Sequence, residues 1–220
     1  MTGKRAGFAR ERRDIIGACR QMNALGINQG RAGNISLRVK GGLLVTPSGM
    51  PYDVMAPADI VFMEADGTVP PGQREPSSEW RFHHDILAGR PEVGAVVHTH
   101  AMFATTLSCL HMEIPAFHYM VAVAGGDTIR CAPYATFGTQ ALSDHAVKAL
   151  AGRKACLLAN HGMIAVGETL AKAMALAVEV ETLAAQYWRA LQVGKPVLLS
   201  KKEMRLVIEK FSTYGHQGED

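Results

Sequence analysis

The chain has 220 residues, of which 48% are hydrophobic and 20% are charged, and its formal net charge is +3. This composition suits one compact domain with a substantial core. The basic residues are scattered without a long Lys/Arg run, which argues against a nucleic-acid-binding or anionic-membrane-binding protein. The small basic excess would still favour the approach of a phosphorylated metabolite.

We expect a cytoplasmic protein. The basic segment from Met1 to Ala6 is not followed by an apolar stretch of signal-peptide length, and no apolar run is long enough to cross a bilayer. The four cysteines form no Cys-x-x-Cys pair and lie in apolar neighbourhoods, so we expect buried free thiols at these positions: Cys19, Cys109, Cys131 and Cys156.

The first half of the chain predicts one helix and a cluster of strands. Apolar residues recur at helical spacing from Ile15 to Met22, and the pattern breaks at Gly26. Gly41-Gly42 is typical of a hairpin turn between two strands. The predicted strands are 34–39, 43–45 and 60–63.

Helices alternate with apolar strands in the second half. Pro76-Ser77-Ser78-Glu79 predicts a helix start capped by a serine, and this helix should end at Gly89-Arg90-Pro91. Further strands are expected at 93–97 and 156–159, and further helices at about 140–150, 169–191 and around residues 204–211. Clustered strands with interspersed helices predict an α/β layered sandwich around a mixed sheet.

Three histidines at strand ends suggest a metal site. His98 and His100 are two residues apart, so both imidazoles would project from the same side of a strand. His161 also ends an apolar strand, and Gly162 lets the backbone turn beside it. Three imidazoles suit zinc. Taken alone, His-x-His is equally compatible with two polar residues at a strand end, and His161 is better explained as a core histidine.

The remaining histidines show no paired spacing, and we interpret them as surface or structural residues: His83, His84, His111, His118, His145 and His216.

Ser77-Ser78-Glu79 is a second candidate site. The free amides of a helix N-terminus favour a phosphate, the serine hydroxyls add donors, and Glu79 could act as metal ligand or general base. An ordinary capped helix explains the same residues. Gly33-Asn34 and Ser48-Gly49 are glycine-bearing turns that would allow close approach of a ligand.

Six stretches, taken in order, resemble the class II aldolase/adducin family, and the resemblance extends from Gly33 to Gly215. They are residues 76–83 (PSSEWRFH), 95–100 (AVVHTH), 114–120 (IPAFHYM), 132–139 (APYATFGT), 160–162 (NHG) and 210–215 (KFSTYG). The resemblance implies a single domain over residues 1–220, folded as a three-layer α/β/α sandwich around a mixed, mostly antiparallel sheet. A C-terminal tail from about residue 205 to 220 would contribute to the active site.

The resemblance also implies roles for individual residues. One Zn²⁺ per subunit would be bound by His98, His100, His161 and Glu79, with Glu79 also serving as acid/base. The phosphate would be held by Gly33, Asn34, Ser48, Gly49, Ser77 and Ser78. Tyr119 of a neighbouring subunit and Tyr214 would be catalytic, and Phe137, Phe211 and Tyr214 would shape the aldehyde pocket. A C4 homotetramer with sites at subunit interfaces is implied.

The activity implied is reversible cleavage of a ketose 1-phosphate, of the L-fuculose 1-phosphate type, to dihydroxyacetone phosphate and a small aldehyde such as lactaldehyde. Aldolases for 5-deoxypentulose or methylthioribulose 1-phosphates remain open, as do a pentulose-phosphate epimerase or dehydratase on the same fold. A non-catalytic adducin-type module is less compatible, because the three histidines and Glu79 are all present.

One position departs from the family pattern. The phosphate loop commonly carries Thr-Ser before Gly-Asn, whereas Arg31-Ala32 stand here before Gly33-Asn34. Two hydroxyl donors are lost and a guanidinium is gained, and a guanidinium can bind a phosphate in a bidentate way. We therefore add Arg31 to the candidate phosphate-binding residues.

Overall fold

The structure, a computed structural model, describes residues 7–213 and the side chains as far as Phe211. A seven-stranded sheet with the order β3-β2-β1-β4-β7-β6-β5 runs through the centre. The strands are β1 (Asn34–Val39), β2 (Gly42–Val45), β3 (Val61–Glu64), β4 (Ala95–Thr99), β5 (Arg130–Ala132), β6 (Ala155–Leu158) and β7 (Gly162–Gly167). Neighbouring strands are antiparallel except β5 and β6, which are parallel.

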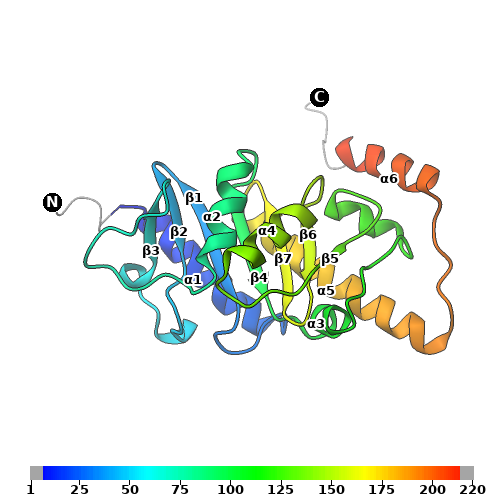
Figure 1. The fold of residues 1–220 in the computed structure, drawn as a ribbon, viewed down its shortest axis with the longest axis horizontal. Coiled ribbons are helices and arrows are strands. Elements are labelled where there is room, and N and C mark those ends of the chain that lie inside the picture. The colour runs from blue at the N-terminus through cyan, green and yellow to red at the C-terminus, as the bar shows by residue number, and fades with distance from the viewer. Residues whose placement is uncertain (1–6, 214–220) are drawn as a thin grey trace, which may run out of the picture.

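Helices cover both faces of this sheet (Figure 1). The first face is covered by α1 (Ala9–Ala24), α3 (Met102–Cys109) and α5 (Leu170–Val193), and the second by α2 (Trp80–Gly89) and α4 (Gln140–Ala149). Successive strand residues point to opposite faces. Val97 of β4 accordingly packs in the core under α1 and α5, and Val96 in the core under α2 and α4. The predicted three-layer α/β/α sandwich around a mostly antiparallel sheet is confirmed.

The C-terminal helix α6 (Lys201–Thr213) lies away from the sheet and packs on η3, a 3-10 segment over Tyr119–Ala124. The rings of Tyr119 and Phe211 are stacked, with centroids 6.3 Å apart and planes only 5° from parallel. Two shorter 3-10 segments, η1 (Tyr52–Val54) and η2 (Pro57–Asp59), precede β3.

Three local expectations were incomplete or wrong. The sequence did not predict α3 or β7, although β7 pairs with β4, the strand that carries His98, and α3 packs on β6 and β7. The predicted serine cap of α2 is absent: within the described residues, Glu79 occupies the cap position and α2 has no side-chain cap. All four cysteines are free, but only Cys19 and Cys156 are buried, and Cys109 is exposed.

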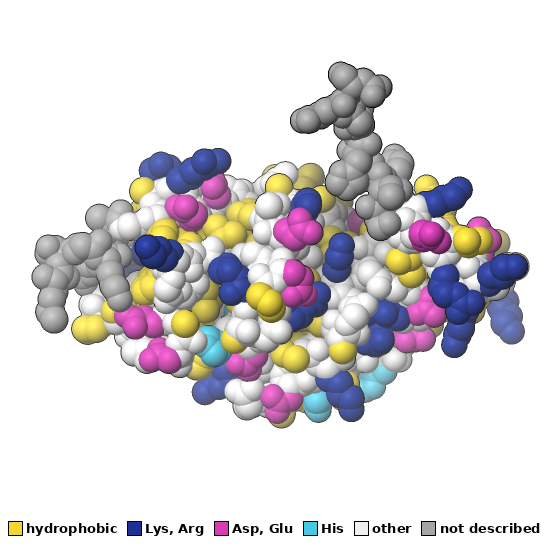
Figure 2. Space-filling model, turned by 90° about the horizontal axis from the view of Figure 1, so that it is seen from above, with side chains coloured by type: hydrophobic (Ala, Val, Ile, Leu, Met, Phe, Trp, Pro, Cys, Tyr) yellow, Lys and Arg dark blue, Asp and Glu magenta, His cyan; other side chains and the backbone are white. Residues whose placement is uncertain are grey.

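The surface carries charges of both signs. Seen from above, Lys and Arg side chains are interspersed with Asp and Glu and with apolar groups (Figure 2). Among the helices of residues 7–213, none combines the length and the apolarity that a membrane span needs.

Candidate active site

Four side chains from distant parts of the chain converge at one edge of the sheet. Glu79 stands just before α2, His98 lies in β4, His100 follows β4, and His161 lies between β6 and β7. One potential ligand atom from each of them lies within 4.8 Å of the others. The three imidazole rings are 4.8–4.9 Å apart between centroids, at 69–82° to one another.

Strand register explains this convergence. β4 and β7 are antiparallel, with His98 opposite Ile164 and Thr99 opposite Met163, so the end of β4 lies beside the start of β7. His161 stands directly before β7 and therefore meets the two histidines of β4. A Cβ atom at Gly162 would collide with the Thr99 carbonyl oxygen and would come within 3.1 Å of the His100 ring. Glycine is required here because the two chain segments approach so closely.

His98 is held in the orientation that a metal ligand needs. It is fully buried, and its Nδ1–H donates to the Met163 carbonyl oxygen at 2.9 Å. This bond leaves the lone pair on Nε2, which lies 3.0 Å from Nε2 of His100 and 3.3 Å from Oε2 of Glu79. Burial lowers the pKa of His98 to about 3 and also lowers the pKa of His100, so both rings are neutral at physiological pH and can donate a lone pair.

Glu79 presents a buried carboxylate to these rings. Burial acts to raise its pKa, but His98, His161 and a hydrogen bond from Asn34 hold the pKa below its ordinary value, so the group is ionised. Oε2 accepts from Nδ2 of Asn34 at 2.8 Å. Oε1 lies 3.0 Å from Nε2 of His161, and no other polar group of the described residues bonds to it. A buried carboxylate oxygen beside three imidazoles is a set of ligands that fits a divalent cation.

A second layer of polar residues supports Glu79. Oδ1 of Asn34 lies 2.5 Å from Nε2 of His83, and Nδ1 of His83 lies 2.8 Å from the Ser36 hydroxyl. Both Ser36 and His83 are fully buried. Sequence reasoning did not connect His83 with the site, although its position four residues after Glu79, on one face of a helix, is a signal that could have done so.

The loops that carry the candidate phosphate-binding residues lie next to one another. Arg31 donates through Nη1 to the Gly49 carbonyl oxygen at 2.6 Å, which joins the first loop to the second. The Ser48 amide donates to the Glu75 carbonyl oxygen at 3.0 Å, which joins the second loop to the residues before Glu79. Arg31, Ser48, Gly49 and Ser78 are exposed, and their polar groups are open to a ligand.

Gly33, Asn34 and Ser77 are placed differently. A Cβ atom on Gly33 would lie 2.6 Å from the His98 carbonyl oxygen, so the absence of a side chain lets this loop pack on β4. Both polar ends of the Asn34 amide are occupied, by Glu79 and His83. Ser77 is buried, with its Oγ 3.3 Å from the Glu79 amide, from which it accepts.

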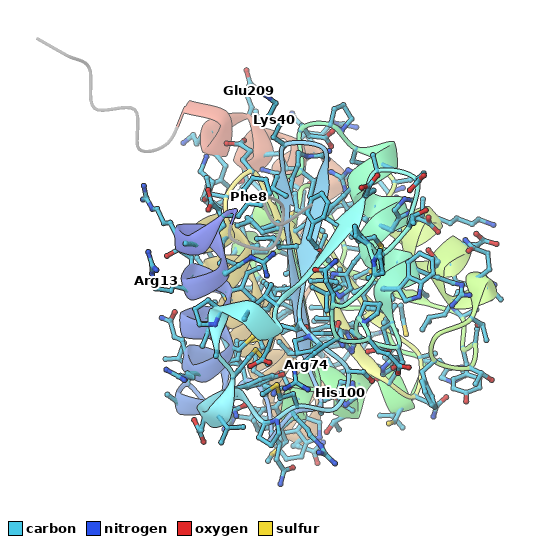
Figure 3. All side chains as sticks on the ribbon, turned by 90° about the vertical axis from the view of Figure 1, so that its left-hand side faces the viewer. Phe8, Arg13, Lys40, Arg74, His100 and Glu209 are labelled. Atoms are coloured by element: carbon cyan, nitrogen blue, oxygen red, sulfur yellow. The ribbon has the colours of Figure 1, made fainter. Side chains whose placement is uncertain are left out.

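A cavity of about 300 Å³ opens beside the cluster, and Glu79, His100 and His161 line it. It is lined by Ala32, Ser78, Glu79, His100, Tyr134, Ala135, Phe137, Asn160 and His161. Phe137 thus lies where an aldehyde pocket was expected. Within the described residues, neither Tyr119 nor Phe211 reaches this cavity: Glu209, on the same helix as Phe211, lies at the end of the molecule opposite His100 (Figure 3). Tyr214 lies outside the described residues.

Comparison with known proteins identifies the family. The model of the class II aldolase and adducin N-terminal domain matches residues 13–188. The chain belongs to this family. A 5-methylthioribulose-1-phosphate/5-deoxyribulose-1-phosphate aldolase of Rhodospirillum rubrum is 60% identical to this class II aldolase over 215 residues, spanning 98% of this chain and 96% of the relative. An L-fuculose phosphate aldolase of Escherichia coli K12 is 51% identical over 204 residues, spanning 92% of this chain and 94% of the relative.

Solved structures agree. An L-fuculose 1-phosphate aldolase superimposes with a TM-score of 0.91 at 39% identity, over 96% of this chain and all of the other. A crystal structure of YgbL from Escherichia coli, a putative aldolase/epimerase/decarboxylase, gives a TM-score of 0.79 at 27% identity, over 91% of this chain and 98% of the other. The chain is therefore a class II aldolase, a carbon–carbon lyase of a metal-dependent class, and its His/Glu cluster could hold the metal.

The first prediction concerns cation binding. We expect His161→Ala to weaken binding of a divalent cation by about a hundredfold or more, because one of three imidazoles is lost. Glu79→Gln keeps all three imidazoles and should retain the cation. Calorimetric titration of metal-free protein with Zn²⁺ measures the affinity of each variant for the cation, and His145→Ala on α4 is the control. Equal affinity in His161→Ala and His145→Ala would show that the cluster does not bind the cation.

Proposed function

We propose that this class II aldolase cleaves a ketose 1-phosphate between C3 and C4, giving dihydroxyacetone phosphate and a short aldehyde. The proposal is carried by one juxtaposition: the His/Glu cluster lines a cavity with the exposed Ser78 on its rim. Arg31 stands next to the lining residue Ala32 and is hydrogen-bonded to Gly49 of the Ser48-Gly49 loop. A phosphate on that rim would hold the reacting carbons over the cluster, so that binding energy provides orientation.

For the ketose we favour 5-methylthioribulose 1-phosphate or 5-deoxyribulose 1-phosphate over L-fuculose 1-phosphate. The relative named for the first pair shares 60% identity, against 51% for the L-fuculose phosphate aldolase. The cavity wall of Tyr134, Ala135 and Phe137 also suits an apolar methylthio or methyl terminus. L-fuculose 1-phosphate remains the second candidate, since the well-matched solved structure is an L-fuculose 1-phosphate aldolase.

We assign the cation site to His98, His100, His161 and Glu79, and one Zn²⁺ per subunit to that site, because three imidazoles and a carboxylate match zinc. A bound cation supplies Lewis-acid stabilisation of the negative charge that develops on C3 as the bond breaks. Glu79, ionised in the free site, would take up one proton and deliver it to C3, and the ketone half leaves as dihydroxyacetone phosphate. The C4 hydroxyl loses one proton as the aldehyde forms, which balances the proton that Glu79 takes up.

A retro-aldol assay tests this function. We expect release of dihydroxyacetone phosphate from 5-deoxyribulose 1-phosphate and 5-methylthioribulose 1-phosphate, with lower kcat/KM for L-fuculose 1-phosphate. A chelator should abolish turnover and added Zn²⁺ should restore it. Glu79→Gln should lose about a hundredfold or more in kcat, because a general acid/base is removed, while Glu168→Gln, an exposed carboxylate at the other end of β4 and β7, should be unaffected.

Two results of this assay would contradict the proposal. The first is turnover that is unchanged in chelated, metal-free enzyme. The second is a product other than dihydroxyacetone phosphate, such as an epimer or a dehydrated ketose, which would move the chain to another activity on the same fold.

We assign Arg31 to phosphate binding. One nitrogen of its guanidinium donates to the Gly49 carbonyl oxygen, and this bond holds the side chain against the phosphate loops. Arg31 is exposed, so its other guanidinium N–H groups can reach a ligand. A guanidinium held in this way can donate two parallel hydrogen bonds to a phosphate.

Replacement of Arg31 provides a third prediction. Arg31→Ala should raise KM for the ketose 1-phosphate about tenfold with little change in kcat, because a charge-assisted contact to the non-reacting phosphate is lost. Initial rates over a range of substrate concentrations give KM and kcat separately. Arg20→Ala is the matched control, since Arg20 also donates to backbone carbonyl oxygens, those of Tyr52 and Asp53. Equal KM values in the two variants would exclude the assignment.

We propose that the active enzyme is a C4 homotetramer in which each site is completed by a neighbouring subunit. Tyr119 is 50% exposed and stacks on Phe211, and α6, which carries Phe211, lies at the opposite end of the molecule from His100. A catalytic role for Tyr119, which would transfer the C4 hydroxyl proton, and a place for Phe211 in the aldehyde pocket therefore require a second copy.

Subunit mixing tests this arrangement. Glu79→Gln and Tyr119→Phe should each be nearly inactive alone, because each lacks one proton-transfer group. Mixed and reassembled tetramers should recover about a quarter of wild-type activity, since random assembly in a heterologous ring pairs an intact Glu79 with an intact neighbouring Tyr119 in that share of sites. Mixtures without recovery would show that both groups act within one chain.

A further inference from the structure

The polar side of β1, which the sequence pattern would place in solvent, is buried. Asn34, Ser36 and Arg38 alternate with apolar residues, a pattern that usually places the polar side chains in water. Here α2 covers them: Asn34 and Ser36 contact His83 of α2, and Arg38 donates to the carbonyl oxygen of Leu87 at the end of the same helix. Asn34, Ser36 and His83 are each at most 5% exposed. A buried polar cluster is retained at a cost in desolvation unless each member is hydrogen-bonded.

The direction of every hydrogen bond in this cluster follows from Glu79. An ionised carboxylate only accepts, so the Asn34 group that faces Oε2 must be the NH₂. Oδ1 of Asn34 then faces His83 and accepts, which requires a proton on Nε2 of His83. Nδ1 of the neutral ring is consequently an acceptor, and the Ser36 hydroxyl must donate to it. Burial lowers the pKa of His83 to about 3, so the ring is neutral and has one proton to place.

We propose that Ser36 and His83 are positioning residues for the reaction: through Asn34 they hold the Glu79 carboxylate so that Oε2 is engaged and Oε1 stays free toward the cation and substrate. The proposal rests on the proposed function, in which Glu79 carries the proton. Neither residue lines the cavity or belongs to the converging group of four, and their hydrogen-bonded connection to Glu79 runs through Asn34.

The alternative arrangement shows what the chain of hydrogen bonds prevents. If His83 carried its proton on Nδ1, Nε2 would become an acceptor and the Asn34 amide would turn to donate to it. Oδ1 of Asn34 would then face Oε2 of Glu79, oxygen against oxygen, and the carboxylate would rotate away. The ionised carboxylate therefore selects the tautomer protonated on Nε2, and the Ser36 hydroxyl stabilises that tautomer and holds the ring by donating to Nδ1.

The tautomer of His83 gives a readout that does not depend on activity. In metal-free protein labelled with ¹⁵N-histidine, long-range ¹H–¹⁵N spectra should show His83 as a neutral ring protonated on Nε2, assigned by its loss in His83→Phe. In Ser36→Ala, Nδ1 loses its hydrogen-bond donor, so the ¹⁵N resonance of Nδ1 should move to the position of a ring nitrogen without a hydrogen bond. A wild-type His83 protonated on Nδ1, or an Nδ1 resonance unchanged in Ser36→Ala, would overturn the proposal.

Kinetics test the consequence. Ser36→Ala should lower kcat about tenfold, as loss of an outer partner of a metal ligand typically does, with KM within about twofold and cation content unchanged. Ser143→Ala is the matched control: Ser143 is also fully buried, and its hydroxyl bonds Asp85 on the far side of α2, away from this cluster. Turnover by the wild-type enzyme tests the proposed function by itself. The role of Ser36 is tested separately, by the ratio of kcat in Ser36→Ala to kcat in Ser143→Ala.

A double-mutant cycle separates positioning from general loss of stability. If Ser36 acts through His83, adding Ser36→Ala to His83→Phe should lower kcat no further. Equal kcat values for Ser36→Ala and Ser143→Ala, or independent multiplication of the two effects in the double variant, would overturn the assignment. Should His83→Phe fail to fold, the spectra and the comparison of the two serine variants still decide the question.

Discussion

The buried carboxylate of Glu79 is the constraint around which this end of the molecule is built. A carboxylate that is 5% exposed costs several kcal/mol in lost hydration unless polar partners surround it. One oxygen has such a partner in Asn34, and the other has the His161 imidazole 3.0 Å away as its one polar neighbour among the described residues. A cation among the imidazoles would give the second oxygen the charged partner that a buried carboxylate needs.

The sheet supplies the rigidity that such a site needs. Asn34 lies opposite His98 in the β1–β4 ladder, and Ile164 lies opposite His98 on the other side in β7. Three neighbouring strands thus position the fully buried His98, and a backbone carbonyl on β7 selects its tautomer. A shift of one residue in either register would turn His98 to the other face. The same packing that stabilises the fold therefore determines where the nitrogen atoms point.

The sequence alone predicts the parts of this site that repeat a simple period. His98-x-His100 at the end of an apolar run, and His161 before a glycine, suggested a metal cluster, and the family resemblance added Glu79 and turned the suggestion into a prediction. The partners of Glu79 were harder to predict, because Asn34 and Ser36 lie on what reads as the polar, solvent-facing side of a strand. Only tertiary packing shows that α2 covers that side. α3 and β7 were missed for a related reason: they are short or nearly uniformly buried, and such segments lack the alternation that marks an amphipathic element.

The division between strand ends and loops bears on how substrate choice can vary in this fold. The four converging residues are held by ladder register and buried hydrogen bonds, whereas Arg31, Ser48, Tyr134 and Phe137 are exposed and lie outside regular strands and helices. Loops accept substitution at little cost to the core. Relatives named for 5-deoxyribulose 1-phosphate and for L-fuculose phosphate share 60% and 51% identity with this chain. Under the proposed function, a common centre that breaks the same bond, surrounded by replaceable contacts for the two ends of the sugar, would account for that range of names.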